Sequence, residues 1–177
     1  MQRVAINGSL GAGKSTLAAS LHELLGLPYV EIDSLKHGPG WQDSPTFVDD
    51  VARFVQGERW VIEYQYDEVR PLILERADTL VWLDLPVRNV MWQVVRRTVR
   101  RRWRHEELWN GNREGPLWRN LVDREYPVRW AWHTRRWPAG RADEARTGRP
   151  DLAVVRLRSR GEIDAWLAGL RSAGTPG

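Results

Sequence analysis

The feature that most constrains the fold is a run of eight residues near the start of the chain, 8–15, which reads Gly-Ser-Leu-Gly-Ala-Gly-Lys-Ser. It matches the pattern G-x-x-x-x-G-K-[ST] in full. An apolar run at residues 4–6 precedes it, and from Lys14 onward leucines and alanines recur at helical spacing. The sequence therefore predicts a buried strand, a glycine-rich turn and an amphipathic helix in direct succession.

The glycine-rich turn has the composition of a phosphate-binding loop. Glycines let the backbone curl so that several N–H groups point at one anion, and the helix that follows adds the positive end of its dipole. In this motif the lysine reaches the β- and γ-phosphates and the serine hydroxyl binds Mg²⁺, so we expect ATP and Mg²⁺ as cofactors. The expected nucleotide contacts in the loop are Gly8, Ser9, Gly11, Ala12, Gly13, Lys14, Ser15 and Thr16.

Strand-like and helix-like patterns alternate along the rest of the chain. This alternation predicts an α/β fold of three layers, with a parallel sheet between two layers of helices. Ligands of such sheets bind beyond the carboxyl ends of the strands. Five segments have the apolar pattern of strands: residues 4–6, 29–33, 60–62, 79–83 and 153–157.

Size and composition suit a single domain over residues 1–177, with 42% hydrophobic and 28% charged residues. The sequence has no cysteine, no apolar run long enough for a membrane span and no signal-peptide pattern. We therefore expect a cytoplasmic protein without a membrane partner. Toward the C-terminus we expect a helix over 126–137, a polar loop over 138–150 and a disordered tail over 172–177.

Acidic residues follow the expected strands, where a parallel sheet gathers its ligands. Asp33 is expected to accept the proton of an attacking hydroxyl group or to hold a Mg²⁺-bound water, and Glu31 shares its face of the strand. Asp84 ends an apolar run, the pattern of a Walker B aspartate, and Glu63 is a similar candidate with less support. The alternative for each is a solvated carboxylate in a turn. The expected metal-binding residues are Ser15, Asp33 and Asp84.

Arginine dominates the basic residues, since only two of the 27 lysines and arginines are lysines. Coding bias explains this composition, and so does the affinity of guanidinium groups for phosphate. Several arginines fall at 96–104 on a long helix, where spacing of three and four places Arg97 and Arg101 on one face. We expect these two to stabilise a transferred phosphoryl group, and the alternative is a solvated basic face.

Further motifs accompany the glycine-rich loop. They are Glu31-Ile-Asp33-Ser-Leu, Gly40-Trp41, Arg59-Trp-Val-Ile62, Ala77-Asp-Thr-Leu-Val-Trp-Leu-Asp84-Leu-Pro86 and Val154-Val-Arg-Leu-Arg-Ser159. Together they cover nearly the whole chain and resemble the adenylate-kinase-like and shikimate-kinase-like P-loop NTPases, above all the group labelled topology modulation proteins. The resemblance implies a five-stranded sheet in the order 2-3-1-4-5, a substrate-side region at 35–57 and a helical lid at 100–140. It also implies that the loop after the last strand, near residues 158–160, passes the adenine, and we expect Arg158 to contact the nucleotide. Where the family often has Asp-Gly after the third strand, this chain has Glu63-Tyr64.

The leading hypothesis is a P-loop kinase that transfers the γ-phosphoryl group of ATP to a hydroxyl or phosphate of a small-molecule acceptor. We expect a nucleoside or nucleotide first and a sugar-like or antibiotic-like alcohol second, with Trp41, Tyr64 and Tyr66 as candidates for stacking or for packing. The alternatives are a nucleic-acid-associated P-loop ATPase and a nucleotide-binding protein without efficient catalysis. Both a monomer and a homodimer stay open. The expected catalytic residues are Lys14, Asp33, Arg97 and Arg101.

Overall fold

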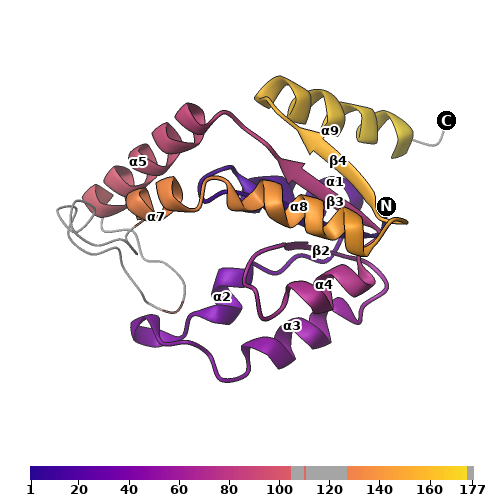
Figure 1. Ribbon diagram of the computed structural model, residues 1–177, viewed down its shortest axis with the longest axis horizontal. Helices are drawn as coiled ribbons and strands as arrows, with labels where there is room; N and C mark the ends of the chain where they lie inside the picture. Colours follow the sequence, from indigo (N-terminus) through magenta and orange to yellow (C-terminus); the bar gives the residue numbers. More distant parts are fainter. Residues whose placement is uncertain (105–109, 111–126, 175–177) are drawn as a thin grey trace.

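The computed structural model describes residues 1–104, 110 and 127–174. Four parallel strands form its central sheet, with neighbours in the order β2-β1-β3-β4 (Figure 1). None of the helices in these ranges is both long and apolar enough to cross a membrane. The strands are β1 (Arg3–Gly8), β2 (Trp60–Glu63), β3 (Thr79–Leu83) and β4 (Ala153–Leu157).

Helices cover both faces of this sheet, as the alternating pattern predicts. They are α1 (Lys14–Leu25), α2 (Ile32–Lys36), the 3₁₀ turn η1 (Pro39–Trp41), α3 (Phe47–Val55), α4 (Arg70–Arg76), α5 (Val87–Arg104), α7 (Pro127–His133), α8 (Trp137–Gly148) and α9 (Arg160–Gly174). Alternate residues of β1 point to opposite faces. Val4 and Ile6 pack with α1, α5 and α9, whereas Ala5 packs with α3, α4 and α8.

One strand expected from the sequence does not form, so the prediction of five strands is wrong. Of residues 29–33, Tyr29 makes a single parallel bridge to β2, and Ile32 already begins α2. The N–H group and the hydroxyl of Ser34 both donate to the carbonyl oxygen of Glu31. This local turn competes with pairing along a sheet edge. The four strands that do form keep the expected order when the second strand along the chain, at 29–33, is left out.

A second expectation is also wrong, because residues 138–150 form most of α8 instead of a polar loop. The run Pro-Ala-Gly suggests a turn, but Pro138 lies in the first turn of the helix, where its missing N–H group breaks no hydrogen bond. Ala142 and Ala145 follow at helical spacing and are fully buried against the sheet. Small side chains therefore let α8 approach the sheet closely.

The expected lid at 100–140 includes the end of α5, all of α7 and the start of α8. Its residues 105–109 and 111–126 lie outside the described residues. Helix α9 continues to Gly174, so residues 172–174 of the tail expected at 172–177 are helical. Residues 175–177 lie outside the described part.

The strand register brings several strand ends to one edge of the sheet. Ile6 pairs with Glu63, the last residue of β2, and Gly8 pairs with Leu83, the last residue of β3. Leu83 also pairs with Leu157 at the end of β4. The loop after β1 and the residues after β2 and β3 therefore start at nearly the same level.

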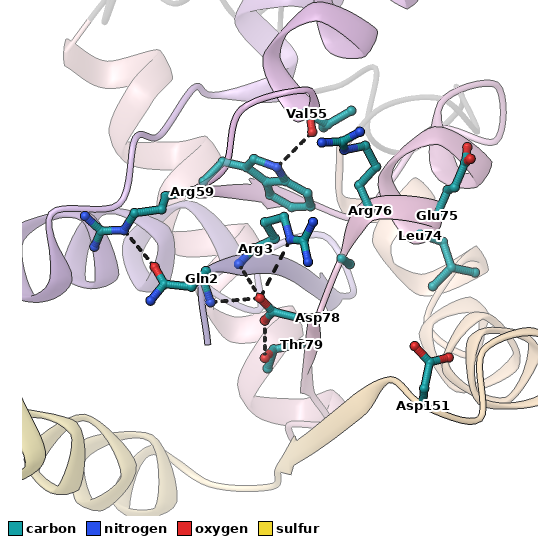
Figure 2. A network of polar contacts seen from close by, with 12 residues as sticks. Gln2, Arg3, Val55, Arg59, Leu74, Glu75, Arg76, Asp78, Thr79 and Asp151 are labelled. Atoms are coloured by element: carbon teal, nitrogen blue, oxygen red, sulfur yellow. Dashed lines mark hydrogen bonds and ion pairs between the residues drawn. The ribbon is translucent and has the colours of Figure 1, made fainter.

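The amino-terminal edge of the sheet is held together by Asp78, the residue before β3 (Figure 2). Its Oδ2 accepts hydrogen bonds from the N–H groups of Gln2 and Arg3, each at 2.9 Å, and its Oδ1 accepts one from the hydroxyl of Thr79 at 2.7 Å. Burial raises the pKa of Asp78, but these hydrogen bonds outweigh it and the net pKa lies below its ordinary value. The carboxylate thus ties the start of β1 to the start of β3.

Candidate active site

The loop between β1 and α1 has the conformation that the glycine pattern predicts. Gly11 and Gly13 have φ of 82° and 95°, in the left-handed region that favours glycine. A Cβ on Gly11 would stand 2.3 Å from Cγ2 of Val94, so α5 packs directly on the loop. In the described structure Gly13 caps α1 without a side-chain hydrogen bond, which leaves the first N–H groups of the helix for an anion.

Lys14 begins α1, and its side chain is almost entirely buried. Its Nζ lies 3.4 Å from the carbonyl oxygen of Ser9, a long contact for a buried ammonium group. Burial lowers the pKa of Lys14, whereas the nearby carboxylates of Glu63 and Asp33 raise it. A phosphate beside this ammonium would supply the hydrogen-bond acceptors that a buried cation needs.

Glu63 ends β2 and is only 1% exposed. The hydroxyl of Ser15 donates to its Oε1 at 2.5 Å. Burial raises the pKa of Glu63 to about 7, against the opposing effect of Lys14. A carboxylate and a hydroxyl side by side offer the oxygen ligands that Mg²⁺ prefers.

Asp33 lies in the first turn of α2, opposite the segment that follows β2. Its Oδ1 accepts hydrogen bonds from Nε2 of Gln65 and from the hydroxyl of Tyr66, both at 2.7 Å. Since both bonds fall on Oδ1, Oδ2 remains for another partner. The charge of Asp33 also raises the pKa values of Lys14 and Glu63, so the structure brings two of the expected catalytic residues, Lys14 and Asp33, together.

Tyr66 is held by aromatic and polar contacts on several sides. Its ring meets the ring of Phe47 edge to face at 5.4 Å, and its oxygen lies 3.2 Å from Nε2 of His37. Burial and the Asp33 carboxylate raise the pKa of Tyr66 far above its ordinary value, so the phenol keeps its proton. Because that proton goes to Asp33, His37 must donate from Nε2 to the phenol oxygen.

Cations from two helices approach the glycine-rich loop. Arg97 of α5 and Arg141 of α8 both lie near enough to Lys14 to lower its pKa. Arg101 is partly buried one turn beyond Arg97 on the same face of α5. The guanidinium of Arg141 lies 5.5 Å from the ring centre of Trp137, with the side chain 14% exposed. Sequence reasoning missed Arg141 because it placed this residue in a loop.

Asp84, the expected Walker B residue, has a different partner. Nε and Nη2 of Arg156 donate to its Oδ2 at 2.9 and 2.5 Å. The same guanidinium lies 4.3 Å from the ring centre of Trp82, which fixes its position. The structure therefore engages Asp84 in an ion pair between β3 and β4, while Ser15 bonds Glu63 instead.

The loop after β4 approaches the nucleotide loop through Arg160, which ends the segment expected at 158–160. The backbone N–H of Arg158 donates to the carboxylate of Glu162 at 2.8 Å, at the start of α9. The guanidinium of Arg160 would lie 3.6 Å from a Cβ on Gly13, and its Nη2 donates to Gln93 at 2.6 Å. Arg160 thus lies over the glycine-rich loop.

Of the three aromatic candidates, Tyr66 bonds Asp33, and Trp41 is linked to Tyr66 through the ring of His37. Trp41 is 42% exposed and contacts the ring of His37 edge to face at 5.5 Å, and His37 in turn contacts Tyr66. Tyr64 is instead buried in the core next to Arg70. The rings of His37, Trp41 and Tyr66 form one wall near the Asp33 carboxylate.

A hollow lies elsewhere in the described residues. A largely apolar hollow of about 360 Å³ lies between α5 and α7, lined by Met91, Val128, Arg129, Trp132 and His133. No cluster of three or more His, Asp or Glu side chains in residues 1–104, 110 and 127–174 is arranged to hold a metal ion. This is compatible with Mg²⁺, which proteins bind through one or two carboxylates plus phosphate oxygens.

The fold is shared with solved kinase structures. Shikimate kinase from Acinetobacter baumannii, in complex with shikimate, has a TM-score of 0.54 and 14% identity, over 98% of this chain and 92% of that one. A sugar kinase from Janibacter sp. HTCC2649 has a TM-score of 0.52 and 17% identity, over 99% of both chains. A putative kinase from Chloroflexus aurantiacus has a TM-score of 0.52 and 16% identity, over 99% of this chain and 100% of that one. No family model and no curated protein sequence matches the chain.

These similarities, together with the loop, define the fold as that of the P-loop kinases. At identities this low they show the fold and not the substrate. The narrower resemblance to topology modulation proteins stays a prediction.

Proposed function

We propose that the protein is an ATP-dependent phosphotransferase, a P-loop kinase acting on a hydroxyl-bearing or phosphate-bearing small molecule. One observation carries the proposal: the buried ammonium of Lys14, the Ser15–Glu63 pair and the Asp33 carboxylate meet beside the glycine-rich loop. This set supplies an anion site, oxygen ligands and a proton acceptor within one cluster.

The residues present fit ATP and Mg²⁺. Left-handed glycines leave room for a close approach of phosphate, and the buried ammonium of Lys14 needs an anion. Bound there, Mg²⁺ and ATP would supply the phosphoryl group and neutralise its charge. For the metal side we keep Ser15 and replace Asp84 by Glu63, because Glu63 is the acid that bonds Ser15. Asp33 is assigned to the acceptor, because Gln65 and Tyr66 occupy its Oδ1 and leave Oδ2 for one partner. For the nucleotide we add Arg160 to Arg158.

We assign the proposed transfer to these side chains as follows. Oδ2 of Asp33 takes the proton of the acceptor hydroxyl, while Gln65 and Tyr66 hold Oδ1. The acceptor oxygen then bonds the γ-phosphorus as the bond from that phosphorus to the bridging oxygen breaks, which releases ADP. Lys14 stabilises the charge that spreads over the transferred group, and we assign the same role to Arg97, Arg101 and Arg141.

The wall of His37, Trp41 and Tyr66 favours an acceptor with a flat ring. A nucleoside or nucleotide is therefore our first candidate, and a small alcohol without a ring is the second. A protein that binds nucleotide without efficient transfer is the outcome if no acceptor in the screen below consumes ATP.

The test is a screen of ATP consumption over nucleosides, nucleoside monophosphates and small alcohols, followed by the Lys14→Ala variant. Loss of the buried ammonium is expected to reduce transfer by roughly a hundredfold or more, while the circular dichroism spectrum is unchanged. The control, Arg53→Ala, removes an exposed cation from α3 and is expected to act like the wild type. Full ATP turnover by Lys14→Ala would refute the assignment, as would absence of nucleotide binding by the folded wild type in calorimetry with Mg²⁺.

A further inference from the structure

Helix α5 carries on its outer side a row of side chains that the proposed reaction does not use. Trp92 and Trp103 are 67% and 82% exposed, and the exposed Val95 and Val99 lie between them. Large apolar side chains in an exposed row mark interaction surfaces more often than isolated ones do. We call this set the outer stripe of α5, and its members are Arg88, Trp92, Val95, Arg96, Val99 and Trp103.

Helical spacing places all six within an arc of about 100° on α5. The other side of the helix is already occupied, because Val90 and Val94 are buried in the core and Arg97 approaches Lys14. Figure 1 shows α5 along one margin of the molecule with α7 beside it. The outer stripe is therefore separate from the candidate active site.

The charge of α5 indicates the kind of partner. Its sequence, VRNVMWQVVRRTVRRRWR, contains seven arginines and no acidic residue. A second copy of the chain is a poor occupant, because a symmetric pair would set each stripe against itself, arginine facing arginine. A single-stranded nucleic acid would use the tryptophans and arginines, but bases stack on rings and gain little from Val95 and Val99.

We propose that the outer stripe of α5 docks the protein on a membrane surface that contains anionic phospholipids. The tryptophans and valines lie at the boundary between headgroups and acyl chains, while Arg88 and Arg96 pair with the phosphates. Rings of tryptophan favour this boundary because they have an apolar body and a polar N–H group. The helix lies flat in the interface, so it needs no membrane span. This departs from the expectation that the protein has no membrane partner.

The test is co-sedimentation of the full chain with vesicles of phosphatidylcholine alone and with vesicles of phosphatidylcholine and phosphatidylglycerol in equal parts. The wild type is expected to bind only the mixed vesicles, and to leave them when salt rises from about 0.1 M to about 1 M. Trp92→Ala with Trp103→Ala is expected to weaken binding roughly tenfold or more, and so is Arg88→Gln with Arg96→Gln.

Matched controls distinguish the effect of the outer stripe from the effect of losing any exposed arginine or tryptophan. Arg53→Gln with Arg146→Gln removes two exposed arginines elsewhere, and Trp132→Ala removes an exposed tryptophan of α7. Both variants are expected to leave vesicle binding within about twofold of the wild type. Lys14→Ala is expected to lose nucleotide and keep vesicle binding, so a failure of the proposed function is distinguishable from a failure of this inference.

Several results would overturn the inference. They are absence of binding to mixed vesicles, equal binding to both vesicle types, and binding that the stripe variants do not weaken. Binding of a single-stranded oligonucleotide that the stripe variants abolish, with vesicles unbound, would assign the surface to nucleic acid instead. A dimer in solution that Trp92→Ala with Trp103→Ala dissociates would assign it to a second copy.

Discussion

At the scale of single residues, the phenol of Tyr66 sets the orientation of Asp33. Tyr66→Phe removes one of two hydrogen bonds to Oδ1 and keeps the ring that packs on Phe47. A hydrogen bond to a charged group contributes about 1.5–3 kcal/mol, so we expect kcat with the identified acceptor to fall by roughly tenfold to a hundredfold. The KM for ATP is expected to stay the same, because the hydroxyl does not contact the nucleotide loop. Steady-state kinetics measure both values.

Tyr64→Phe is the matched control, since it removes the hydroxyl of a neighbouring tyrosine that is buried beside Arg70 and does not bond Asp33. We expect its kcat to equal that of the wild type. Equal kcat values for Tyr66→Phe and Tyr64→Phe would contradict the positioning role.

At the scale of elements, α5 and the glycine-rich loop fit together without space for a side chain. Gly11→Ala adds a Cβ at a φ of 82° and places it 2.3 Å from Val94. We expect the variant to lose about 1–3 kcal/mol of unfolding free energy and most of its nucleotide affinity, because the loop or α5 must move. Thermal unfolding and calorimetry with ATP and Mg²⁺ measure the two effects.

The double variant Gly11→Ala with Val94→Ala separates strain from crowding. It removes the collision but keeps the left-handed backbone, so we expect it to regain part of the nucleotide affinity. Gly140→Ala, in α8 where a Cβ meets no atom within 4 Å, is expected to be neutral or stabilising. Equal losses in Gly11→Ala and Gly140→Ala would show that the contact with α5 is unimportant.

Elements with a strong local pattern could be predicted from the sequence, and those decided by tertiary contacts could not. The loop at residues 8–15 follows from glycine spacing alone. The segment 29–33 has the composition of a strand, but Ser34 closes a local turn that begins at Glu31 and interrupts it. Helix α8 was missed because Pro138 and Gly140 indicate a turn, whereas burial of Ala142 and its neighbours against the sheet stabilises a helix.

The residues of the candidate site also fall into those that the sequence could predict and those that depend on tertiary contacts. The rule that strand ends share an edge predicts that Lys14 and Asp33 lie close together, and they do, although the strand expected before Asp33 is reduced to a single bridge at Tyr29. The choice of Glu63 over Asp84 depends on which acid receives the Ser15 hydroxyl and which meets Arg156, and no local pattern encodes either contact. Arg141 and Arg160 reach the loop only because α8 and the β4–α9 turn fold back over it.

At the scale of the whole molecule, Asp78 couples stability to pH by joining β1 to β3. Its pKa is lower in the folded protein than in the unfolded chain, so its contribution is full above about pH 4 and is lost as pH falls through the folded value. Asp78→Asn replaces one carboxylate oxygen by an NH₂ group, which then faces either the N–H groups of Gln2 and Arg3 or the hydroxyl of Thr79. We expect a loss of about 1–3 kcal/mol at pH 7 that shrinks below pH 4, measured by urea unfolding at several pH values.

Asp143→Asn, at an exposed position of α8, is the control and is expected to change stability by less than about 0.5 kcal/mol at every pH. A loss in Asp78→Asn that stays constant down to pH 2 would show that the charge of Asp78 does not contribute.

The left-handed backbone of Tyr66 affects which residues this position can accept in evolution. Its φ of 59° is unfavourable for a tyrosine by about 1–2 kcal/mol, and glycine would adopt it freely. Packing of the ring on Phe47 offsets this cost, and phenylalanine would keep that packing, so a requirement for the phenol would favour tyrosine over phenylalanine. Among diverging descendants of this sequence, tyrosine at position 66 should persist where Asp33 persists and disappear where Asp33 is lost.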